Sequence, residues 1–443
     1  MTETRPLGAK GSVVAEKPID AGPELRIGKY EVQRQLGKGA TGTVYLATDS
    51  FSGGEVALKT IDPALFLDPE FGAEYRTQFL NEASLAGKLR HPHIVGILDA
   101  VVEEDSGYIA MELVMGGDLA AHASAGALLS VGDVMQIGFK CCGALDYAFQ
   151  EGIFHRDIKP ANIMIAKGTE VKIADFGAAF LRRSQTVQTV AMGSPYYMSP
   201  EQIEGAELTY HSDMYSMGVV LYELLTGHKP FSAGSLEMLV QKILHQTPPA
   251  PSTLRAGIPP EVDAIVLKAM QKKPLDRYDY YDEFALDLAR AARLVGPADV
   301  ISDSEQYVAL KRCETLAELS DSEVWELARA ARWSRVSAGT ALVNENDEGD
   351  SLFFLAGGGA RVTRDGRLIN TIGESECFGE IAYIYGGAAP RHATVVATID
   401  CLLAEFRPFV LMQVSSGAQL QLMRTLVRNL ADRLRDANIK NLA

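Results

Sequence analysis

Two short segments in the middle of the sequence bring together residues that can hold a metal ion and move a proton. In HRDIKPANI, Asp157 can accept a proton from a hydroxyl group, and Lys159 can neutralise a negative group as it is transferred. Asn162 in the same segment and Asp175 in the later IADFG offer oxygen ligands of the kind that Mg²⁺ prefers. Their combination, in this order and spacing, favours a phosphoryl-transfer site.

A glycine-rich segment upstream, LGKGATGTVYLA, could hold the phosphates. Gly37, Gly39 and Gly42 form a G-x-G-x-x-G pattern followed by Val44. Because glycine has no Cβ, backbone N–H groups in such a loop can approach phosphate oxygens. The same spacing opens dinucleotide-binding folds, where it lies between a strand and a helix. Here a strand pattern continues on both sides, which favours a phosphate-covering hairpin instead.

A lysine and a glutamate extend this candidate site. Lys59 ends the apolar strand pattern EVALK, and Glu82 lies within the apolar stripe of the helix pattern FLNEASLAGKL. A carboxylate on a buried helix face needs a partner. We expect Lys59 to be that partner, and the pair to hold the α- and β-phosphates of a nucleotide.

The elements that must position these residues predict an α+β fold. Residues 1–28 lack periodicity and are expected to form a flexible leader. Strand patterns dominate from Tyr30 to about Leu113, with one helix over roughly 70–89. Helical patterns dominate from about 117 to 294, with short strands around 162–174. Residues 29–294 therefore form one predicted domain, β-rich first and α-rich afterwards.

A second, smaller domain is predicted over residues 314–443, after a polar, turn-rich linker at 295–313. It begins with a helix near 314–331 and continues with short alternating runs broken by Gly and Asp, which favour a small β-barrel of hairpins. The chain ends in an amphipathic helix pattern, whose leucines recur every four residues at Leu422, Leu426, Leu430 and Leu434.

The motifs of the first domain resemble the eukaryotic-type protein kinase catalytic domain, in its bacterial serine/threonine form, over about residues 28–294. The resemblance implies a bilobal fold that binds ATP and two Mg²⁺ between its lobes. It implies that Asp157, Lys159, Lys59 and Glu82 are catalytic, with Asn162 and Asp175 as the metal ligands. It further implies that the nucleotide contacts Leu36, Gly37, Gly39, Gly42, Val44, Ala57, Lys59, Met111, Glu112, Val114, Asn162 and Asp175.

The resemblance also implies supporting and regulatory residues. Asp213 is expected to hold the catalytic loop, and Glu201 to pair with Arg277. An arginine beside the catalytic aspartate can dock a phosphate, so Thr186 and Thr189 are hypothesised autophosphorylation sites.

The smaller domain carries its own candidate site in CFGEIAYIYGGAAPRHATVVA. A short helix starting near Glu380 could present backbone N–H groups to an anion, and Arg391 could donate to two oxygens of a phosphate. Glu380 could accept from a ribose hydroxyl, and a backbone amide near Ala393 or Thr394 could cap the phosphate.

This stretch resembles the phosphate-binding cassette of cyclic-nucleotide-binding domains, and the resemblance covers about residues 314–443. It implies a jelly-roll-like barrel with tight turns at Gly349 and Gly359. The implied ligand is cAMP in preference to cGMP, although His392 follows the arginine where members of either preference tend to carry other residues. The implied contacts are Gly379, Glu380, Ile381, Arg391, His392, Ala393 and Thr394.

The bulk composition excludes several other classes of protein. A formal net charge of −15 disfavours nucleic-acid binding, which requires a basic face. The apolar runs are too short for a membrane span. The five cysteines have no metal or disulfide spacing, and Cys141 and Cys142 are expected to be packing residues. These observations predict a soluble cytoplasmic protein.

The combined interpretation is a serine/threonine protein kinase that acts on protein substrates and is regulated by a cyclic nucleotide. Two alternatives stay open. The C-terminal domain could be a docking or dimerisation module without a ligand, or the kinase fold could be a scaffold without catalysis. The terminal helix could cap a bound base, pack on the kinase, or pair with a second copy in a homodimer.

Overall fold

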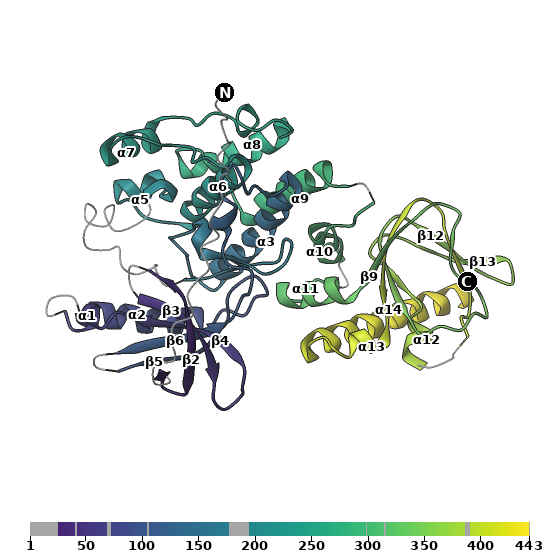
Figure 1. The fold of residues 1–443 in the computed structure, drawn as a ribbon. Helices are drawn as coiled ribbons and strands as arrows, with labels where there is room; N and C mark the ends of the chain where they lie inside the picture. Colours follow the sequence, from purple (N-terminus) through teal and green to yellow (C-terminus); the bar gives the residue numbers. More distant parts are fainter. Residues whose placement is uncertain are drawn as a thin grey trace, which may run out of the picture. The chain divides into compact units, whose positions relative to one another are not determined.

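The computed structural model describes residues 25–39, 42–68, 72–103, 106–176, 195–297, 299–313, 316–385 and 390–442. The chain forms two compact units, whose helices and strands are labelled in Figure 1. The first comprises Met1–Arg76 with Ile97–Leu113, and the second comprises Thr77–Gly96 with Val114–Ala443.

The first unit is built on an antiparallel sheet with the strand order β1-β2-β3-β4-β6-β5. Its buried centre contains Tyr30, Ala47, Val56, Leu58 and Ala110. The predicted β-rich character of residues 30–113 is confirmed, and so is the long helix predicted among them, α2, which begins in the first unit and continues from Thr77 in the second. The elements are β1 (Arg26–Ile27), β2 (Tyr30–Lys38), β3 (Gly42–Asp49), β4 (Glu55–Ile61), α1 (Pro63–Phe66), α2 (Gly72–Ala86), β5 (Ile97–Val102) and β6 (Gly107–Glu112).

The second unit begins with helices around a buried central helix, α6 (Tyr210–Thr226). Nearly every side chain of α6 is buried, which explains its apolar sequence MGVVLYELL. The predicted catalytic segments adjoin the short hairpin of β7 (Ile163–Ile165) and β8 (Val171–Ile173). Cys141 and Cys142 are fully buried, as predicted for packing residues. The other helices of this part are α3 (Val131–Gln150), α5 (Pro200–Glu204), α7 (Leu236–His245), α8 (Pro260–Ala269) and α9 (Tyr281–Val295).

Among the described residues, five helices and two four-stranded sheets form the C-terminal part of the second unit. The strand orders are β10-β15-β12-β13 and β14-β11-β16-β9. The elements are α10 (Asp303–Lys311), α11 (Asp321–Ala330), β9 (Arg332–Val336), β10 (Ala341–Val343), β11 (Leu352–Gly357), β12 (Ala360–Arg364), β13 (Arg367–Ile372), β14 (Cys377–Phe378), α12 (Glu380–Tyr385), β15 (Thr394–Ala397), β16 (Cys401–Phe406), α13 (Pro408–Leu411) and α14 (Ser416–Leu442).

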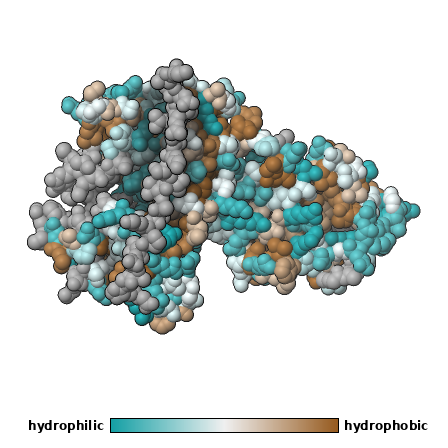
Figure 2. Space-filling model, viewed as in Figure 1, coloured by the Kyte–Doolittle hydropathy of each residue, from teal (hydrophilic) through white to brown (hydrophobic). Residues whose placement is uncertain are grey.

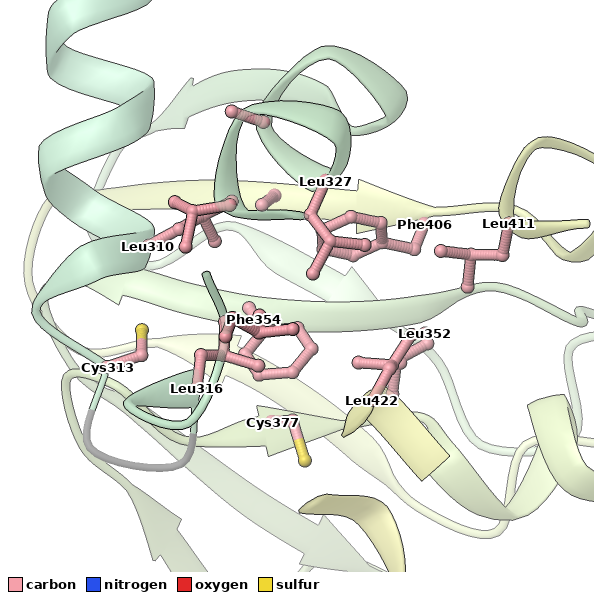
Figure 3. Close-up of a cluster of buried hydrophobic side chains, with 14 of the residues drawn as sticks. Leu310, Cys313, Leu316, Leu327, Leu352, Phe354, Cys377, Phe406, Leu411 and Leu422 are labelled. Carbon is pink, nitrogen blue, oxygen red and sulfur yellow. The ribbon is translucent and has the colours of Figure 1, made fainter. Parts of the chain in front are cut away.

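Strand β11 has apolar residues at successive positions, LFFLA, because both of its faces pack against other elements. Alternate side chains of a strand point to opposite faces. Leu352 and Phe354 join a cluster with the helices (Figure 3), whereas Phe353 and Leu355 join a second cluster with β15 and β16. Both faces of this strand are therefore buried.

Two details of the C-terminal part differ from the sequence-based expectations. The segment expected to be a linker contains α10, whose N-cap Ser302 accepts from the amide of Glu305. The tight turn expected at Gly359 falls on Gly358, which has φ 100°. A Cβ on Gly358 would crowd the carbonyl oxygen of Asp400, so this position needs glycine.

The face drawn in Figure 2 carries polar and apolar side chains interspersed over the C-terminal part. Among the helices of the described residues, none has both the length and the apolar character that a membrane crossing requires.

Candidate active site and anion site

A buried carboxylate fixes the backbone of the predicted catalytic loop. Asp213, on α6, is 2% exposed and accepts hydrogen bonds from the backbone N–H groups of His155 (2.8 Å) and Arg156 (2.7 Å). Burial raises the pKa of Asp213. Arg156 takes the left-handed conformation, with φ 65°, which a non-glycine residue keeps only when its surroundings hold it there. The expected loop-holding contact of Asp213 is thus present.

The loop brings Asp157, Lys159 and Asn162 together. Lys159 Nζ lies 2.7 Å from Asp157 Oδ2. Asn162 Nδ2 donates to the Asp157 backbone oxygen (2.9 Å) and to Asp157 Oδ2 (3.2 Å). These contacts orient the Asp157 carboxylate and place a positive charge beside it.

The two predicted metal ligands are joined through the backbone. The amide of Ala174, which precedes Asp175, donates to the Asn162 carbonyl oxygen at 2.8 Å. His155 Nε2 lies 2.8 Å from the Ala174 carbonyl oxygen, and Asp175 itself has φ 60°.

The donor types fit Mg²⁺. Because its amide nitrogen is committed to Asp157, Asn162 can offer its Oδ1 as an oxygen ligand, and Asp175 can offer a carboxylate. Within the described part of the chain, no group of three or more His, Cys, Asp or Glu side chains could hold a metal ion. An amide and a carboxylate alone suit an ion that takes its remaining ligands from phosphate and water.

The predicted pair of Glu201 and Arg277 is confirmed as a buried, two-pronged ion pair. Arg277 Nη1 and Nη2 lie 2.7 Å and 2.8 Å from the two carboxylate oxygens of Glu201. Burial alone would raise the pKa of Glu201, but the Arg277 guanidinium, together with hydrogen bonds from the backbone and from Ser212, lowers the pKa. Ser212 Oγ donates to the same carboxylate at 2.8 Å, so the pair is well satisfied.

The first unit carries the predicted glycine hairpin and the strands behind it. The Gly39 amide donates to the Gly42 carbonyl oxygen at 2.8 Å, and Gly37 pairs with Val44. A Cβ on Gly42 would overlap the carbonyl oxygen of Thr60, so a larger residue cannot stand there. The loop tip at 40–41 lies outside the described residues.

The pairing of the strands places several residues that are predicted to contact the nucleotide on one face of the sheet in the first unit. Val44 lies opposite Lys59, and Ala57 lies opposite Met111. Directly paired residues share a face and residues two apart on a strand share it too, so these four side chains form one row. Leu36 is 40% exposed and lies at an irregularity between β2 and β3. Glu112 ends β6 opposite Val56, and Val114 begins the next stretch of the second unit.

Three predicted residues lie partly or wholly outside the described part of the chain. Glu82 lies in α2 by its backbone, but its side chain is outside the described residues, and so are Thr186 and Thr189. The Lys59–Glu82 pair and the two phosphorylation sites therefore stay predictions.

In the C-terminal domain, Arg391 is buried in a cradle of backbone. It is 7% exposed, and its Nη1 donates to the carbonyl oxygens of Ser351 (3.0 Å) and Gly379 (3.4 Å). A Cβ on either Gly349 or Gly379 would come within 3 Å of its guanidinium, so both glycines make room for it. The guanidinium also lies 5.5 Å from the Phe353 ring centroid.

Glu380, at the start of α12, is 4% exposed and acts electrostatically on Arg391. Burial lowers the pKa of Arg391, while the nearby carboxylates of Asp350, Glu405 and Glu380 raise it. The structure thus brings the predicted glutamate and arginine into one buried, charged site.

The remaining predicted contacts differ in exposure. His392 is exposed, Ile381 is 37% exposed, and Ala393 and Thr394 are half-buried. The Thr394 hydroxyl accepts from the Glu345 amide at 2.9 Å, so it holds a turn. The carbonyl of Ser351 and the ring of Phe353 were missed, because a backbone acceptor and one aromatic ring in an apolar run leave no recognisable sequence signal.

Comparison with known families assigns the class of the protein. Residues 30–284 match the protein kinase domain model, which is more than half of the chain, and the chain belongs to this family. Residues 333–415 match the cyclic nucleotide-binding domain model. The architecture is therefore a protein kinase fold, with a β-rich and a helical lobe, followed by a β-sheet domain of the cyclic nucleotide-binding type.

Individual relatives are bacterial serine/threonine-protein kinases. PknB of Mycolicibacterium smegmatis is 37% identical over 294 residues, 64% of this chain and 46% of that protein. PrkC of Bacillus subtilis is 37% identical over 266 residues, 60% and 40% of the two chains. The crystal structure of the Mycobacterium tuberculosis PknI kinase domain aligns with 62% of this chain and all of that one, at 31% identity and a TM-score of 0.48. The chain spans about half or less of the length of the curated relatives it matches.

Proposed function

We propose that this protein is a serine/threonine protein kinase that transfers the γ-phosphoryl group of ATP to hydroxyl groups of protein substrates. The observation that carries the proposal is the ordered cluster of Asp157, Lys159 and Asn162 on a loop held by Asp213. The reaction would take place in the cytoplasm, where ATP is available, and neither nucleic acid nor a membrane would take part in it.

In the proposed mechanism each residue of the cluster has one task. Asp157 accepts the proton of the attacking hydroxyl, and Lys159 neutralises charge on the transferred group. Asn162 and Asp175 would hold Mg²⁺, which when bound supplies positive charge to the ATP phosphates. Lys59 and the glycine hairpin, both in the first unit, would hold the phosphates, and Glu82 of α2 would orient Lys59.

The Asp157→Asn variant tests this role. Removal of the proton acceptor should lower the phosphorylation rate by about 10²–10⁴-fold, measured as transfer of labelled phosphate from ATP to a generic protein substrate. Asp276→Asn, at an exposed position, is the matched control and should keep the wild-type rate. A rate for Asp157→Asn equal to that of the control would make the kinase fold a scaffold without this catalysis.

We further propose that the C-terminal domain binds a cyclic nucleotide, with cAMP preferred over cGMP, and that binding regulates the kinase. What supports the proposal is a buried guanidinium in a glycine-lined cradle with a buried glutamate beside it. The cyclic phosphate would accept from Arg391, and the ribose hydroxyl would donate to Glu380.

Calorimetric titration of cAMP and cGMP into the full chain tests the ligand. Loss of a charge-assisted contact worth roughly 1.5–3 kcal/mol in Arg391→Ala should weaken binding by about 10- to 150-fold. Arg407→Ala, an exposed arginine in the same domain, should bind as the wild type does. Tighter binding of cGMP would reverse the base preference, and binding of neither nucleotide would overturn the proposed ligand.

One observation favours a second role for this domain. Helix α14 exposes Leu420, Val427 and Leu434 at seven-residue spacing, a pattern typical of helix pairing. A docking or dimerisation module without a ligand would use this face, and the titration separates the two roles.

A further inference from the structure

The helices α10 and α11 lie between the two segments that match known families, residues 30–284 and 333–415. They are nevertheless packed firmly against the kinase domain. Gln136 of α3 and Ser304 of α10, both buried, exchange two hydrogen bonds of 2.7 Å and 3.1 Å. Lys140 of α3, whose side chain is fully buried, lies 2.6 Å from Asp303. Helix α10 is thus fixed to α3 by buried polar contacts.

Helix α11 presents a tryptophan to the same region of the kinase. Trp325 is 3% exposed and stacks on Tyr307 of α10, with 4.6 Å between ring centroids. The rings of Trp325 and His93 pack in a T-shaped arrangement, with 4.8 Å between their centroids. Nearby, Ser322 Oγ donates to the Arg90 carbonyl oxygen at 2.9 Å. Residues at the start and middle of α11 therefore contact the kinase segment 90–93.

One turn further along α11, Arg329 contacts a second kinase segment. Its Nη2 lies 2.6 Å from Glu170 Oε2. Lys140 Nζ lies 2.7 Å from the other oxygen of Glu170. Trp325 and Arg329 are four residues apart, so they lie on one face of the helix.

Both contacted segments support β8. Glu170 immediately precedes this strand. His93 lies alongside the strand, and its backbone carbonyl oxygen accepts from the Ile173 amide at 2.8 Å. The His93 Nδ1 lies 2.9 Å from the Val171 carbonyl oxygen. The strand leads directly into Ala174 and the predicted metal ligand Asp175. Helix α11 thus contacts both supports of the strand that carries this aspartate.

The opposite side of α11 belongs to the core of the C-terminal domain. Leu327 lies in a buried cluster with Phe354 and Phe406 (Figure 3). Val324 belongs to the same cluster, and Tyr383 of α12 packs against it. Helix α12 begins at Glu380, so the cluster adjoins the helix that carries one residue of the anion site, which is the buried pair of Glu380 and Arg391. One helix is therefore packed against the anion-site domain on one side and the supports of β8 on the other.

We infer that Trp325 and Arg329 are positioning residues that transmit the state of the Arg391 site to β8 and so to Asp175. The inference rests on the proposed cyclic-nucleotide regulation. Because interior packing is dense and responds in discrete shifts, a small displacement of α11 would move the supports of β8 with it. The shift would change how well Asp175 holds Mg²⁺.

The test compares Trp325→Ala and Arg329→Ala in the full chain, with Trp325→Phe and Arg329→Lys as conservative partners. Three quantities are measured: cAMP affinity by calorimetry, the ratio of phosphorylation rates with and without cAMP, and the Mg²⁺ concentration for half-maximal rate. Arg361→Ala, an exposed arginine on β12, is the control.

We expect the alanine variants to bind cAMP within about 2-fold of wild type. We expect the rate ratio and the Mg²⁺ requirement to change by roughly 2- to 30-fold, with partial recovery in the conservative variants. An unchanged ratio and Mg²⁺ requirement in folded alanine variants would overturn the inference and leave the proposed function intact. If the wild type bound no cyclic nucleotide, the proposed regulation would fail, and an unchanged Mg²⁺ requirement would then also refute the positioning role.

Discussion

At the scale of single residues, the two candidate sites share one device. Each holds a buried charge with backbone groups: Asp213 accepts from two amides, and Arg391 donates to two carbonyls. A charge held in this way fixes the conformation of the surrounding loop as well as its own position. Substituting either residue should therefore change loop geometry as well as charge.

The buried histidines give a pH prediction at the same scale. His91 is 7% exposed, and burial lowers its pKa to about 4, with a smaller raising effect from Asp321. An unfolded histidine has a pKa of about 6.5. Between these values the unfolded chain binds a proton that the folded chain does not, so the free energy of unfolding falls as pH drops from about 6.5 to 4. The His91 share is at most about 3 kcal/mol.

Chemical denaturation of wild type and His91→Phe at pH 7, 5.5 and 4.5 measures this share. The variant should lose less stability on acidification, although His93, whose pKa is also lowered by burial, keeps part of the slope. Equal slopes for both proteins would show that His91 does not carry the predicted effect.

At the scale of elements, α14 has two apolar faces with different roles. Leu426 is fully buried in the cluster that contains Phe354 and Phe406, whereas its neighbour Val427 is 60% exposed. Leu426→Ala should lower the free energy of unfolding of the C-terminal domain by about 2–5 kcal/mol. Val427→Ala should stay within about 0.5 kcal/mol if the face is solvent-exposed.

Tryptophan fluorescence during denaturation can measure both variants, because the two tryptophans of the chain, Trp325 and Trp333, lie in or beside this domain. A large loss in Val427→Ala that depends on protein concentration would reveal pairing of α14 with a second copy. Equal, small losses in both variants would contradict the assigned burial.

The elements also differ in how far they could be predicted. The catalytic loop was predictable because its chemistry requires particular residue types at short spacing, and the Glu201–Arg277 pair followed from the family resemblance. Helix α10 was missed because its segment is polar, with few buried apolar residues to set a periodicity, although Ser302 and Asp303 mark a helix start. The contact of Trp325 with His93 joins residues distant in sequence, and no local pattern encodes such a contact.

At the scale of the whole molecule, a kinase domain and a cyclic nucleotide-binding domain share one chain, with α10 and α11 between the matched segments. Because α10 packs against α3, helices α10 and α11 form a structured connection between the two domains. A structured connection of this kind can carry a coupling free energy between two binding sites, which typically corresponds to a 5- to 150-fold change in affinity.

The most direct test of the account is the phosphorylation rate of a generic protein substrate by the full chain, with and without saturating cAMP, for wild type and Arg391→Ala. The account predicts that cAMP changes the wild-type rate, in either direction, by up to about 150-fold and leaves the variant unchanged. Equal wild-type rates at cAMP concentrations that calorimetry shows to be saturating would contradict it.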